Sequence, residues 1–374
     1  MMNNNQIIKS DERAIFDLRT LYSRYGYSQF KMSRFEEYDL YVKNKDFLVS
    51  DEVITFTDRS GRLMALKPDV TLSIIKNSID KANCVQKVYY NENVYRVSKG
   101  THSFKEIMQA GLECIGDLKS YDIAEVVLLA VKSLALISDN YVLDISHMGL
   151  VAAFLESSGL SHDGKAKAHA CLHQKNTHEL RAICEDEGIS QAHTDKLCAL
   201  IENAGDADDV LSSILPYVET EKEKEAYDEF STLCTIIENS GYANSVIVDF
   251  SVGNDMKYYS GVVFKGYLEG IPTSILSGGQ YDKLLKKMGR TSGAIGFALY
   301  LDLLERMDNT KTEYDIDTVL LYTENTDPLE LTKTVDNISK DGSVLVCTEV
   351  PKGTKYRRLL TYNNGRIETL EDNG

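Results

Sequence analysis

KVYYNENVYRVSKGTHSFKEIMQAGLE, residues 87–113, predicts two strands joined by a short basic loop. The first strand ends at Arg96, a Gly-containing loop covers residues 97–103, and the second strand runs from Phe104 to about Ile115. Runs rich in Val, Tyr, Phe and Ile that flank a short loop with Gly are typical of a β-hairpin. We therefore expect a long hairpin here, with positive charge in its loop.

The second strand has two different faces, because side chains alternate across a strand. One face is apolar and consists of Met108, Ala110, Leu112 and Cys114. The other presents Gln109 and Glu113 in line, and Gly111 between them leaves space. A buried amide and carboxylate need partners, and a bound ammonium group would satisfy both. The alternative is an ordinary hairpin with one solvated face, which is the better interpretation of this strand taken alone.

Composition indicates a soluble protein of the cytoplasm. The chain has 374 residues, of which 43% are hydrophobic and 26% charged, which is enough for two or three domains with a sizeable core. It shows no N-terminal signal pattern and no apolar run near the ~18 residues needed to cross a bilayer. The seven cysteines are scattered without a CxxC pair, which favours reduced thiols over a metal site or disulfides.

The formal net charge of −16 bears on the choice of partner. Proteins that hold nucleic acid usually carry a basic face to neutralise phosphates. The charge therefore disfavours tight tRNA binding, and it excludes no local basic patch.

The organisation predicted on either side of the hairpin is α+β. Residues 12–26 have the spacing of an amphipathic helix, and residues 54–57 and 63–66 flank a turn and predict a second hairpin. Pro68 ends that strand, and Asp69 can cap a helix that starts at Val70.

The remaining segments predict four parts. Residues 1–159 form the first part of a core, residues 160–241 a charged helical insertion, residues 242–312 the second part of the core, and residues 313–374 a small α/β tail. In the second core part we expect a strand at residues 258–266, another at 272–276 and a Gly-rich link at Ser277-Gly278-Gly279.

Two polar patterns in the insertion predict solvated helix faces. His169 and His173 stand at i and i+4, where a metal could be chelated, but no third ligand follows at a fixed spacing. The run EKEKE, Glu221 to Glu225, likewise indicates a solvated face rather than a docking site.

Five motifs in order resemble the class II aminoacyl-tRNA synthetases, and within them histidyl-tRNA synthetase, over about residues 10–310. They are MALKPDVT (64–71), VYR with QAGLE (94–96 and 109–113), KYYSG (257–261), SGGQYDKLL (277–285) and GAIGFALYLDLL (293–304). Several weak motifs in the family's order make a strong signal. The resemblance implies an antiparallel sheet with flanking helices.

The resemblance also implies a histidine site. In the family, the residues that match Asp69, Thr71, Gln109 and Glu113 hold the ammonium group of the amino acid, and those that match Tyr258 and Tyr259 contact its imidazole. Carboxylates and an amide suit a cation, and tyrosines suit a ring with hydrogen-bonding nitrogens. Arg96 matches the motif 2 arginine and is a candidate contact for a phosphate or another anion.

Other positions depart from the family. Asn254 stands at the place of the catalytic arginine, Lys257 at that of an aspartate, and Ser98 at that of the glutamate after motif 2. The adenine-packing arginine of motif 3 is Leu303, and the arginine of GGRYD is Gln280. Asparagine cannot neutralise a phosphate, and leucine can neither pair nor stack as a guanidinium does. Amino-acid activation needs such fixed charges, so we expect no adenylate formation.

Together with a short tail and an acidic chain, these departures match a second branch, the regulatory subunits of ATP phosphoribosyltransferase. That resemblance implies a noncatalytic, allosteric protein without cofactor or metal, which binds histidine and partners a short-form catalytic subunit at the first step of histidine biosynthesis. It also implies a homodimer formed through the helix at residues 12–26. The alternatives are a divergent histidyl-tRNA synthetase and a synthetase-like small-molecule ligase. Whether histidine binds in this pocket, at the partner interface or at both stays open.

Overall fold

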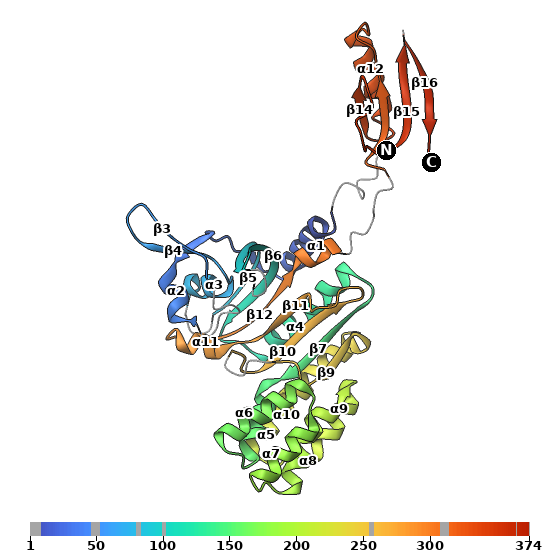
Figure 1. The fold of residues 1–374 in the computed structure, drawn as a ribbon. Coiled ribbons are helices and arrows are strands. Elements are labelled where there is room, and N and C mark those ends of the chain that lie inside the picture. Colours follow the sequence, from blue (N-terminus) through green and yellow to red (C-terminus); the bar gives the residue numbers. More distant parts are fainter. Residues whose placement is uncertain are drawn as a thin grey trace. The chain divides into compact units, whose positions relative to one another are not determined.

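The computed structural model describes residues 9–45, 53–79, 84–98, 102–253, 258–306, 314–363 and 365–373. They divide into two compact units. Residues 14–304 form the large unit, and residues 305–374 with 1–13 form the small unit. Figure 1 shows the elements of both units.

The large unit is built on a sheet of nine strands in its described residues, in the order β1-β5-β6-β12-β11-β10-β7-β9-β8. In that order the strands span Ser28–Gln29, Val85–Val97, Phe104–Gly116, Gly293–Tyr300, Leu276–Gln280, Val262–Leu268, Tyr141–His147, Val246–Asp249 and Ala204–Gly205. The central strands pair antiparallel, whereas β1 with β5 and β7 with β9 pair parallel. The α+β fold is confirmed, with a mixed sheet in place of a purely antiparallel one.

The predicted hairpin is confirmed as β5 and β6. Their register runs without a break from Val85 opposite Gly116 to Val97 opposite Phe104. Ala110, Leu112 and Cys114 are fully buried, as the apolar face predicted. The opposite face is buried too from Gln109 onward, so the solvated alternative is wrong for the part of the strand that carries Gln109 and Glu113.

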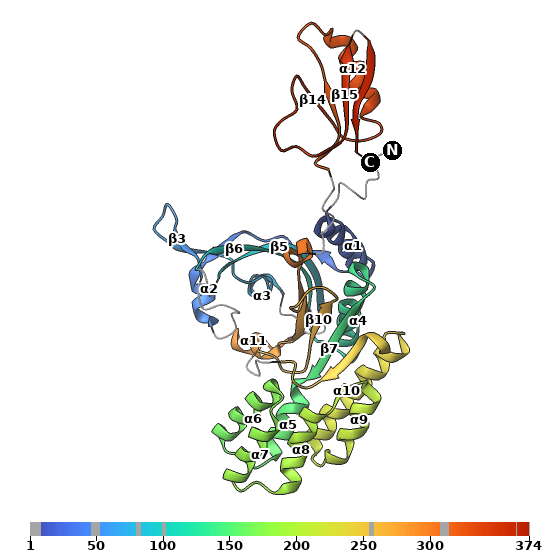
Figure 2. The ribbon, with the colours of Figure 1, turned by 45° about the vertical axis from the view of Figure 1, so that its right-hand side comes forward.

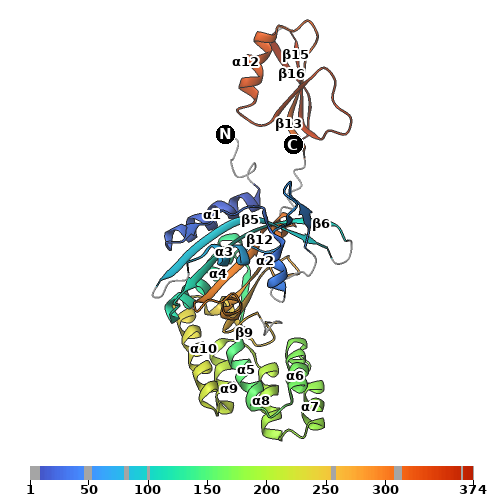
Figure 3. The same cartoon turned by 90° about the vertical axis from the view of Figure 1, so that its left-hand side faces the viewer.

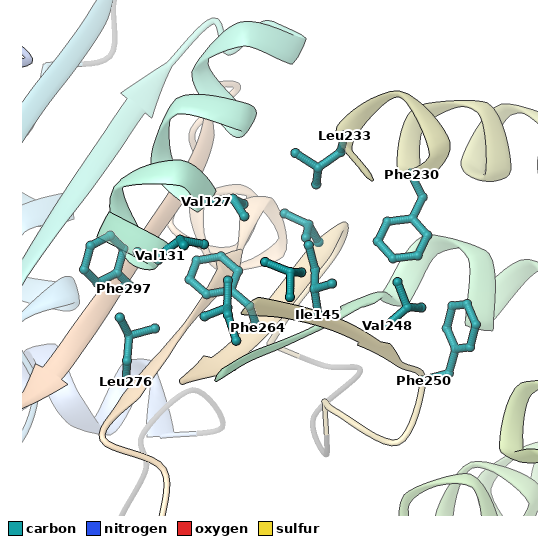
Figure 4. Close-up of a cluster of buried hydrophobic side chains, with 14 of the residues drawn as sticks. Val127, Val131, Ile145, Phe230, Leu233, Val248, Phe250, Phe264, Leu276 and Phe297 are labelled. Atoms are coloured by element: carbon teal, nitrogen blue, oxygen red, sulfur yellow. The ribbon is translucent and has the colours of Figure 1, made fainter. Parts of the chain in front are cut away.

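The main hydrophobic core lies between the sheet and the helices that cover it. Helix α4 (Ser120–Ile137) places Val127 and Val131 against the sheet, close to Phe264 and Phe297. Figure 4 also shows side chains of α10 (Glu221–Asn239) over β7 and β9 in the same cluster. One continuous core thus joins the sheet to the helical region.

Elements at the start of the chain pack on both faces of the sheet. Helix α1 (Ser10–Arg24) belongs to the main hydrophobic core, on the face that α4 covers. Helices α2 (Tyr38–Lys43) and α3 (Thr71–Asn77) pack in a second cluster on the other face, together with a three-stranded sheet of β2 (Phe35–Glu37), β4 (Leu63–Leu66) and β3 (Thr55–Thr57). The second predicted hairpin is therefore confirmed. Asp69 Oδ1 accepts the backbone N–H of Leu72 at 2.9 Å, so its carboxylate stabilises the first turn of α3.

Three local predictions in the second core part are wrong. The strand predicted from Tyr258 starts only at Val262, the strand predicted at residues 272–276 begins only at Leu276, and the expected Gly-rich link lies inside that strand, β11. Gly278 and Gly279 are strand residues because they pair with β10 on one side and β12 on the other, and close neighbours leave no room for a Cβ at either position. A Cβ at Gly278 would lie 2.4 Å from the Cβ of Phe297, and one at Gly279 would lie 2.7 Å from the Tyr259 ring.

The helices after β7 gather at one end of the sheet, as Figures 2 and 3 show from two sides. They are α5 (Met148–Ser157), α6 (His162–Gln174), α7 (Thr177–Asp186), α8 (Gln191–Glu202), α9 (Ala207–Ile214) and α10. The separate insertion of residues 160–241 stays a prediction of domain organisation, because residues 14–304 form one compact unit.

A buried ion pair holds α8 to α10. Lys196 Nζ lies 2.7 Å from Glu223 Oε1 and 4.8 Å from the centre of the Phe154 ring, and Ser157 donates a hydrogen bond to the same carboxylate. Burial opposes the charge, but the hydrogen bonds from Lys196 and Ser157 outweigh it and lower the pKa of Glu223 to about 2. The prediction of a solvated EKEKE face is therefore wrong at its central glutamate.

The small unit has a four-stranded sheet in the order β14-β13-β15-β16. Its strands span Val344–Cys347, Ile316–Leu321, Tyr356–Asn363 and Arg366–Asp372, and α12 spans Pro328–Ile338. Leu331 and Val335 of this helix pack on a core of Leu320, Leu360 and Tyr362. Within the described ranges, no helix of either unit is both long and apolar enough to cross a membrane.

Replacement of Glu223 by Ala is expected to lower the free energy of unfolding by about 3–5 kcal/mol, because it removes the buried carboxylate of the ion pair and leaves Lys196 only the largely exposed Glu219, 3.3 Å away. Urea denaturation followed by circular dichroism measures the change. The matched control is Glu225→Ala on the exposed face of the same helix, which is expected to stay within about 0.5 kcal/mol of the wild type. Equal values for the two variants would contradict a stabilising role for the pair.

Candidate functional site

A cavity of about 180 Å³ opens on the face of the sheet that carries Gln109 and Glu113. All seven residues that the sequence analysis selected line it: Asp69, Thr71, Arg96, Gln109, Glu113, Tyr258 and Tyr259. They come from α3, from the hairpin and from the segment before β10. The structure thus brings together residues that are up to 190 positions apart in the chain, and their role in ligand binding stays a prediction.

Small residues in the central strands make room for the cavity. In the register of β12 with β6, Gly296 lies opposite Glu113 and Ala298 opposite Gly111. A Cβ at Gly296 would lie 1.7 Å from Glu113 Oε2, and one at Gly111 would lie 2.2 Å from the carbonyl oxygen of Phe297. The glycine at position 296 is therefore a condition for the position of the Glu113 carboxylate.

Glu113 is the central polar group of the cavity. Its side chain is buried, Thr71 Oγ1 donates to Oε1 at 2.8 Å, and the Tyr281 hydroxyl donates to Oε2. Burial raises the pKa of Glu113 to about 8, although these two hydrogen bonds lower it and the nearby charge of Asp69 raises it further. The group can therefore be neutral near pH 7 and gain its charge when a cation arrives.

Asp69 and Arg96 both line this cavity, and their opposite charges attract each other. Burial raises the pKa of Asp69, while the N–H of Leu72 and the guanidinium of Arg96 lower it. Arg96 Nε donates to the carbonyl oxygen of Pro68 at 3.2 Å, so the arginine is anchored to the turn before α3. The cavity thus holds acidic groups and, among its described lining residues, the single cationic side chain of Arg96.

The tyrosine pair forms an aromatic wall. The ring centroids of Tyr258 and Tyr259 lie 4.7 Å apart at an interplanar angle of 72°, and Tyr258 lies 5.8 Å from the Tyr281 ring. Burial raises the pKa of both phenols of the pair, so they stay protonated hydrogen-bond donors at neutral pH. An edge-to-face arrangement of this kind suits a further planar ring.

Four residues that bring a hydroxyl group to the cavity were not predicted from the motifs: Tyr90, Ser277, Tyr281 and Tyr300. The hydroxyl of Tyr90 donates to the carbonyl oxygen of Phe297 at 3.4 Å and so reaches across β6 over Gly111. The sequence does contain a signal for Tyr281, because this residue stands in the SGGQYDKLL motif directly after the Gly-rich strand.

Only some of the positions that depart from the family lie among the described residues. Asn254 and Lys257 lie outside the described residues. Leu303 packs on the main hydrophobic core, and Gln280 Nε2 donates to Asp282 Oδ2 at 3.4 Å. Neither of these two side chains lines the cavity.

Glu113 is expected to make stability depend on pH. Its folded-state pKa of about 8 lies above the ordinary value of 4.5. Between these values the folded protein keeps a proton that the unfolded chain has released, so the free energy of unfolding falls as pH rises. From pH 5 to pH 8 the wild type is expected to lose about 3 kcal/mol more than Glu113→Gln, which stays neutral. Parallel denaturation profiles of the two proteins would contradict the raised pKa.

The fold and the cavity agree with the proteins to which this chain is similar. Residues 6–304 match the family model of histidyl-tRNA synthetase. The ATP phosphoribosyltransferase regulatory subunit of Oceanobacillus iheyensis is 28% identical over 293 residues, which cover 78% of this chain and 72% of that protein. The predicted resemblance to proteins of this name is confirmed.

Solved structures share the fold. The crystal structure of an ATP phosphoribosyltransferase regulatory subunit/histidyl-tRNA synthetase from Bacillus halodurans C has a TM-score of 0.77 at 23% identity, covering 94% of this chain and 93% of that chain. The ATP phosphoribosyl transferase (HisG:HisZ) complex from Thermotoga maritima has a chain with a TM-score of 0.61 at 18% identity, covering 77% of this chain and 96% of that chain. The class II synthetase-like fold is thus confirmed, and the match to the family model over most of the sequence means that the chain belongs to the histidyl-tRNA synthetase family.

Proposed function

We propose that the chain is a noncatalytic regulatory subunit of an ATP phosphoribosyltransferase and that it binds histidine in the cavity. Its partner is a short-form catalytic subunit at the first step of histidine biosynthesis. The curated relatives carry this name, and a similar fold occurs in the Thermotoga maritima complex. The observation that carries the proposal is the cavity itself, where acidic groups, an amide, paired tyrosines and one arginine converge.

The chemistry of the cavity suits a free amino acid with a ring. The ammonium group faces Asp69 and Glu113, and the carboxylate faces Arg96, because charged groups of a ligand need opposite charges when they leave water. An imidazole ring lies against Tyr258 and Tyr259, whose hydroxyls can hydrogen-bond to its nitrogens. About 180 Å³ holds on the order of ten water molecules, which is near the size of one histidine.

The same cavity is poorly equipped to activate an amino acid. Transfer to ATP requires several fixed cations around the phosphates, and Arg96 is the cationic residue among the described lining residues. Leu303, at the place of the adenine-packing arginine, is taken up by the core. The family match favours a divergent synthetase as the second candidate function, and the absence of these charges opposes it.

Regulation through this site requires two states of the complex. Histidine can favour one state only if it binds that state more tightly than the other. We propose a homodimer of this chain that docks on the catalytic subunits and needs no tRNA. In this arrangement the bound amino acid reports the concentration of the pathway's product, which is the signal that a first enzyme needs.

Isothermal titration calorimetry with L-histidine tests the site. Glu113→Ala is expected to weaken binding about 10- to 100-fold, because it removes a buried charge-assisted hydrogen bond. Glu106→Ala, on the exposed part of the same strand, is the control and is expected to bind like the wild type. Equal affinity in all three proteins would remove Glu113 from the site.

The same titrations test the protonation of Glu113. A bound ammonium group lowers the pKa of a neighbouring carboxyl, so below pH 8 binding is expected to release a proton. Buffers with different ionisation enthalpies reveal that proton, and Glu113→Ala is expected to abolish its release.

A mixture of this protein with a short-form catalytic subunit tests the function. We expect phosphoribosyl transfer that depends on this chain and is inhibited by histidine, with weaker inhibition for Glu113→Ala. Histidine-dependent exchange of pyrophosphate with ATP by this chain alone would overturn the regulatory proposal and support the synthetase alternative.

A further inference from the structure

The side chains that β12 contributes to the cavity increase abruptly in size. Gly296, Ala298 and Tyr300 lie on the same face of this strand, opposite Glu113, Gly111 and Gln109 of β6 in that order. Gly296 and Ala298 are small, so they form the floor of the cavity and leave the space above them open. Tyr300 fills the next position on this face with a large ring. The floor of the cavity therefore ends at Tyr300 along the direction of β12.

Tyr300 has a fixed partner on the far side of β6. The guanidinium carbon of Arg96 lies 6.0 Å from the centre of the Tyr300 ring, within the range of a cation–π contact. Arg96 belongs to β5 and Tyr300 to β12, and these two strands flank β6 in the sheet. The pair therefore spans β6 from both sides.

The position of Arg96 is itself restrained. Its Nε donates to the carbonyl oxygen of Pro68, which leaves the terminal nitrogens for the cavity and the ring. A guanidinium that is held by a hydrogen bond at its Nε and lies at the limit of cation–π range from an aromatic ring has less freedom to lose when it binds an anion. The Arg96 side chain is thus restrained at this boundary of the cavity.

We propose that the Arg96–Tyr300 pair is the end wall of the cavity and restricts the site to a single free amino acid. The inference rests on the proposed function for the orientation of the ligand. With the ammonium group at Asp69 and Glu113, the carboxylate meets Arg96, and any group attached to that carboxylate collides with Tyr300. Tyr300 is therefore a specificity-determining residue that rejects amides, peptides and acyl nucleotides of the same amino acid.

The end wall gives a physical reason for selectivity that is independent of the missing arginines. A sensor of a free amino acid must ignore the same residue inside peptides and activated esters, which share its side chain and ammonium group. Discrimination between such ligands is achieved by a clash with the wrong ligand rather than by added attraction to the right one. A bulky ring at the carboxylate end supplies that clash.

Calorimetry of the full chain with L-histidine and with L-histidyl-glycine tests the end wall, and the readout is the ratio of the two dissociation constants. In the wild type the dipeptide is expected to bind at least about tenfold more weakly. Tyr300→Ala is expected to lower this ratio several-fold, mainly through tighter dipeptide binding, and the difference that remains reflects the carboxylate that the dipeptide lacks at Arg96. Tyr300→Phe is the matched control, because it keeps the ring and is expected to keep the ratio.

Tyr300→Leu serves as the shortened variant if Tyr300→Ala lacks a cooperative thermal transition. The end wall is overturned if the wild type binds the dipeptide within about threefold of histidine, or if a folded shortened variant leaves the ratio unchanged. Binding of a different amino acid, with rejection of its glycine dipeptide, would overturn the histidine proposal and support the wall. Binding of no amino acid at all would overturn both.

Discussion

Burial of the Glu113 carboxylate is the constraint around which the site is arranged. A buried carboxylate needs hydrogen-bond donors, and here Thr71 and Tyr281 supply them from segments on opposite sides of the cavity. It also needs space, which only glycine at position 296 provides. Even with these partners, burial raises the pKa of Glu113 to about 8, so its carboxyl keeps its proton near pH 7 unless a positive charge lies beside it. In the proposed histidine site, the ammonium group of the ligand supplies the positive charge that this buried carboxyl lacks.

The hairpin connects this site to the rest of the molecule. One face of β6 carries Ala110, Leu112 and Cys114 in the main hydrophobic core, and the other carries Gln109 and Glu113 in the cavity. The core therefore holds the polar groups of the cavity in place, and the described residues contain neither a disulfide nor a group of side chains that could hold a metal ion. Because the same core continues to α10, the helical region is anchored to the sheet that carries the site.

The local sequence pattern predicted the secondary structure well where a single residue type, such as glycine in a turn, decides the backbone conformation. The turn between β3 and β4 and the hairpin of β5 and β6 both lie where a Gly-containing segment separates two β-rich runs. Prediction was wrong where tertiary contacts override pattern. Gly278 and Gly279 resemble a loop in sequence, yet they lie in β11 because they pair with β10 and β12, and the nearby Phe297 and Tyr259 leave no room for a Cβ at either position. Glu223 resembles a solvated residue, yet Lys196 from another helix gives it a buried partner.

The sequence by itself determined the types of group in the site, since motifs in order identify Asp69, Thr71, Gln109, Glu113 and the tyrosine pair with the family's histidine-binding positions. The tertiary structure alone decided that both faces of β6 are buried from Gln109 onward, that Tyr281 donates to the Glu113 carboxylate, and that Arg96 and Tyr300 line the same cavity, with the Arg96 guanidinium carbon 6.0 Å from the centre of the Tyr300 ring. The physical reason is that these contacts join strands distant in the chain. The depth and boundaries of a cavity depend on which side chains meet across the sheet, and no local spacing encodes that meeting.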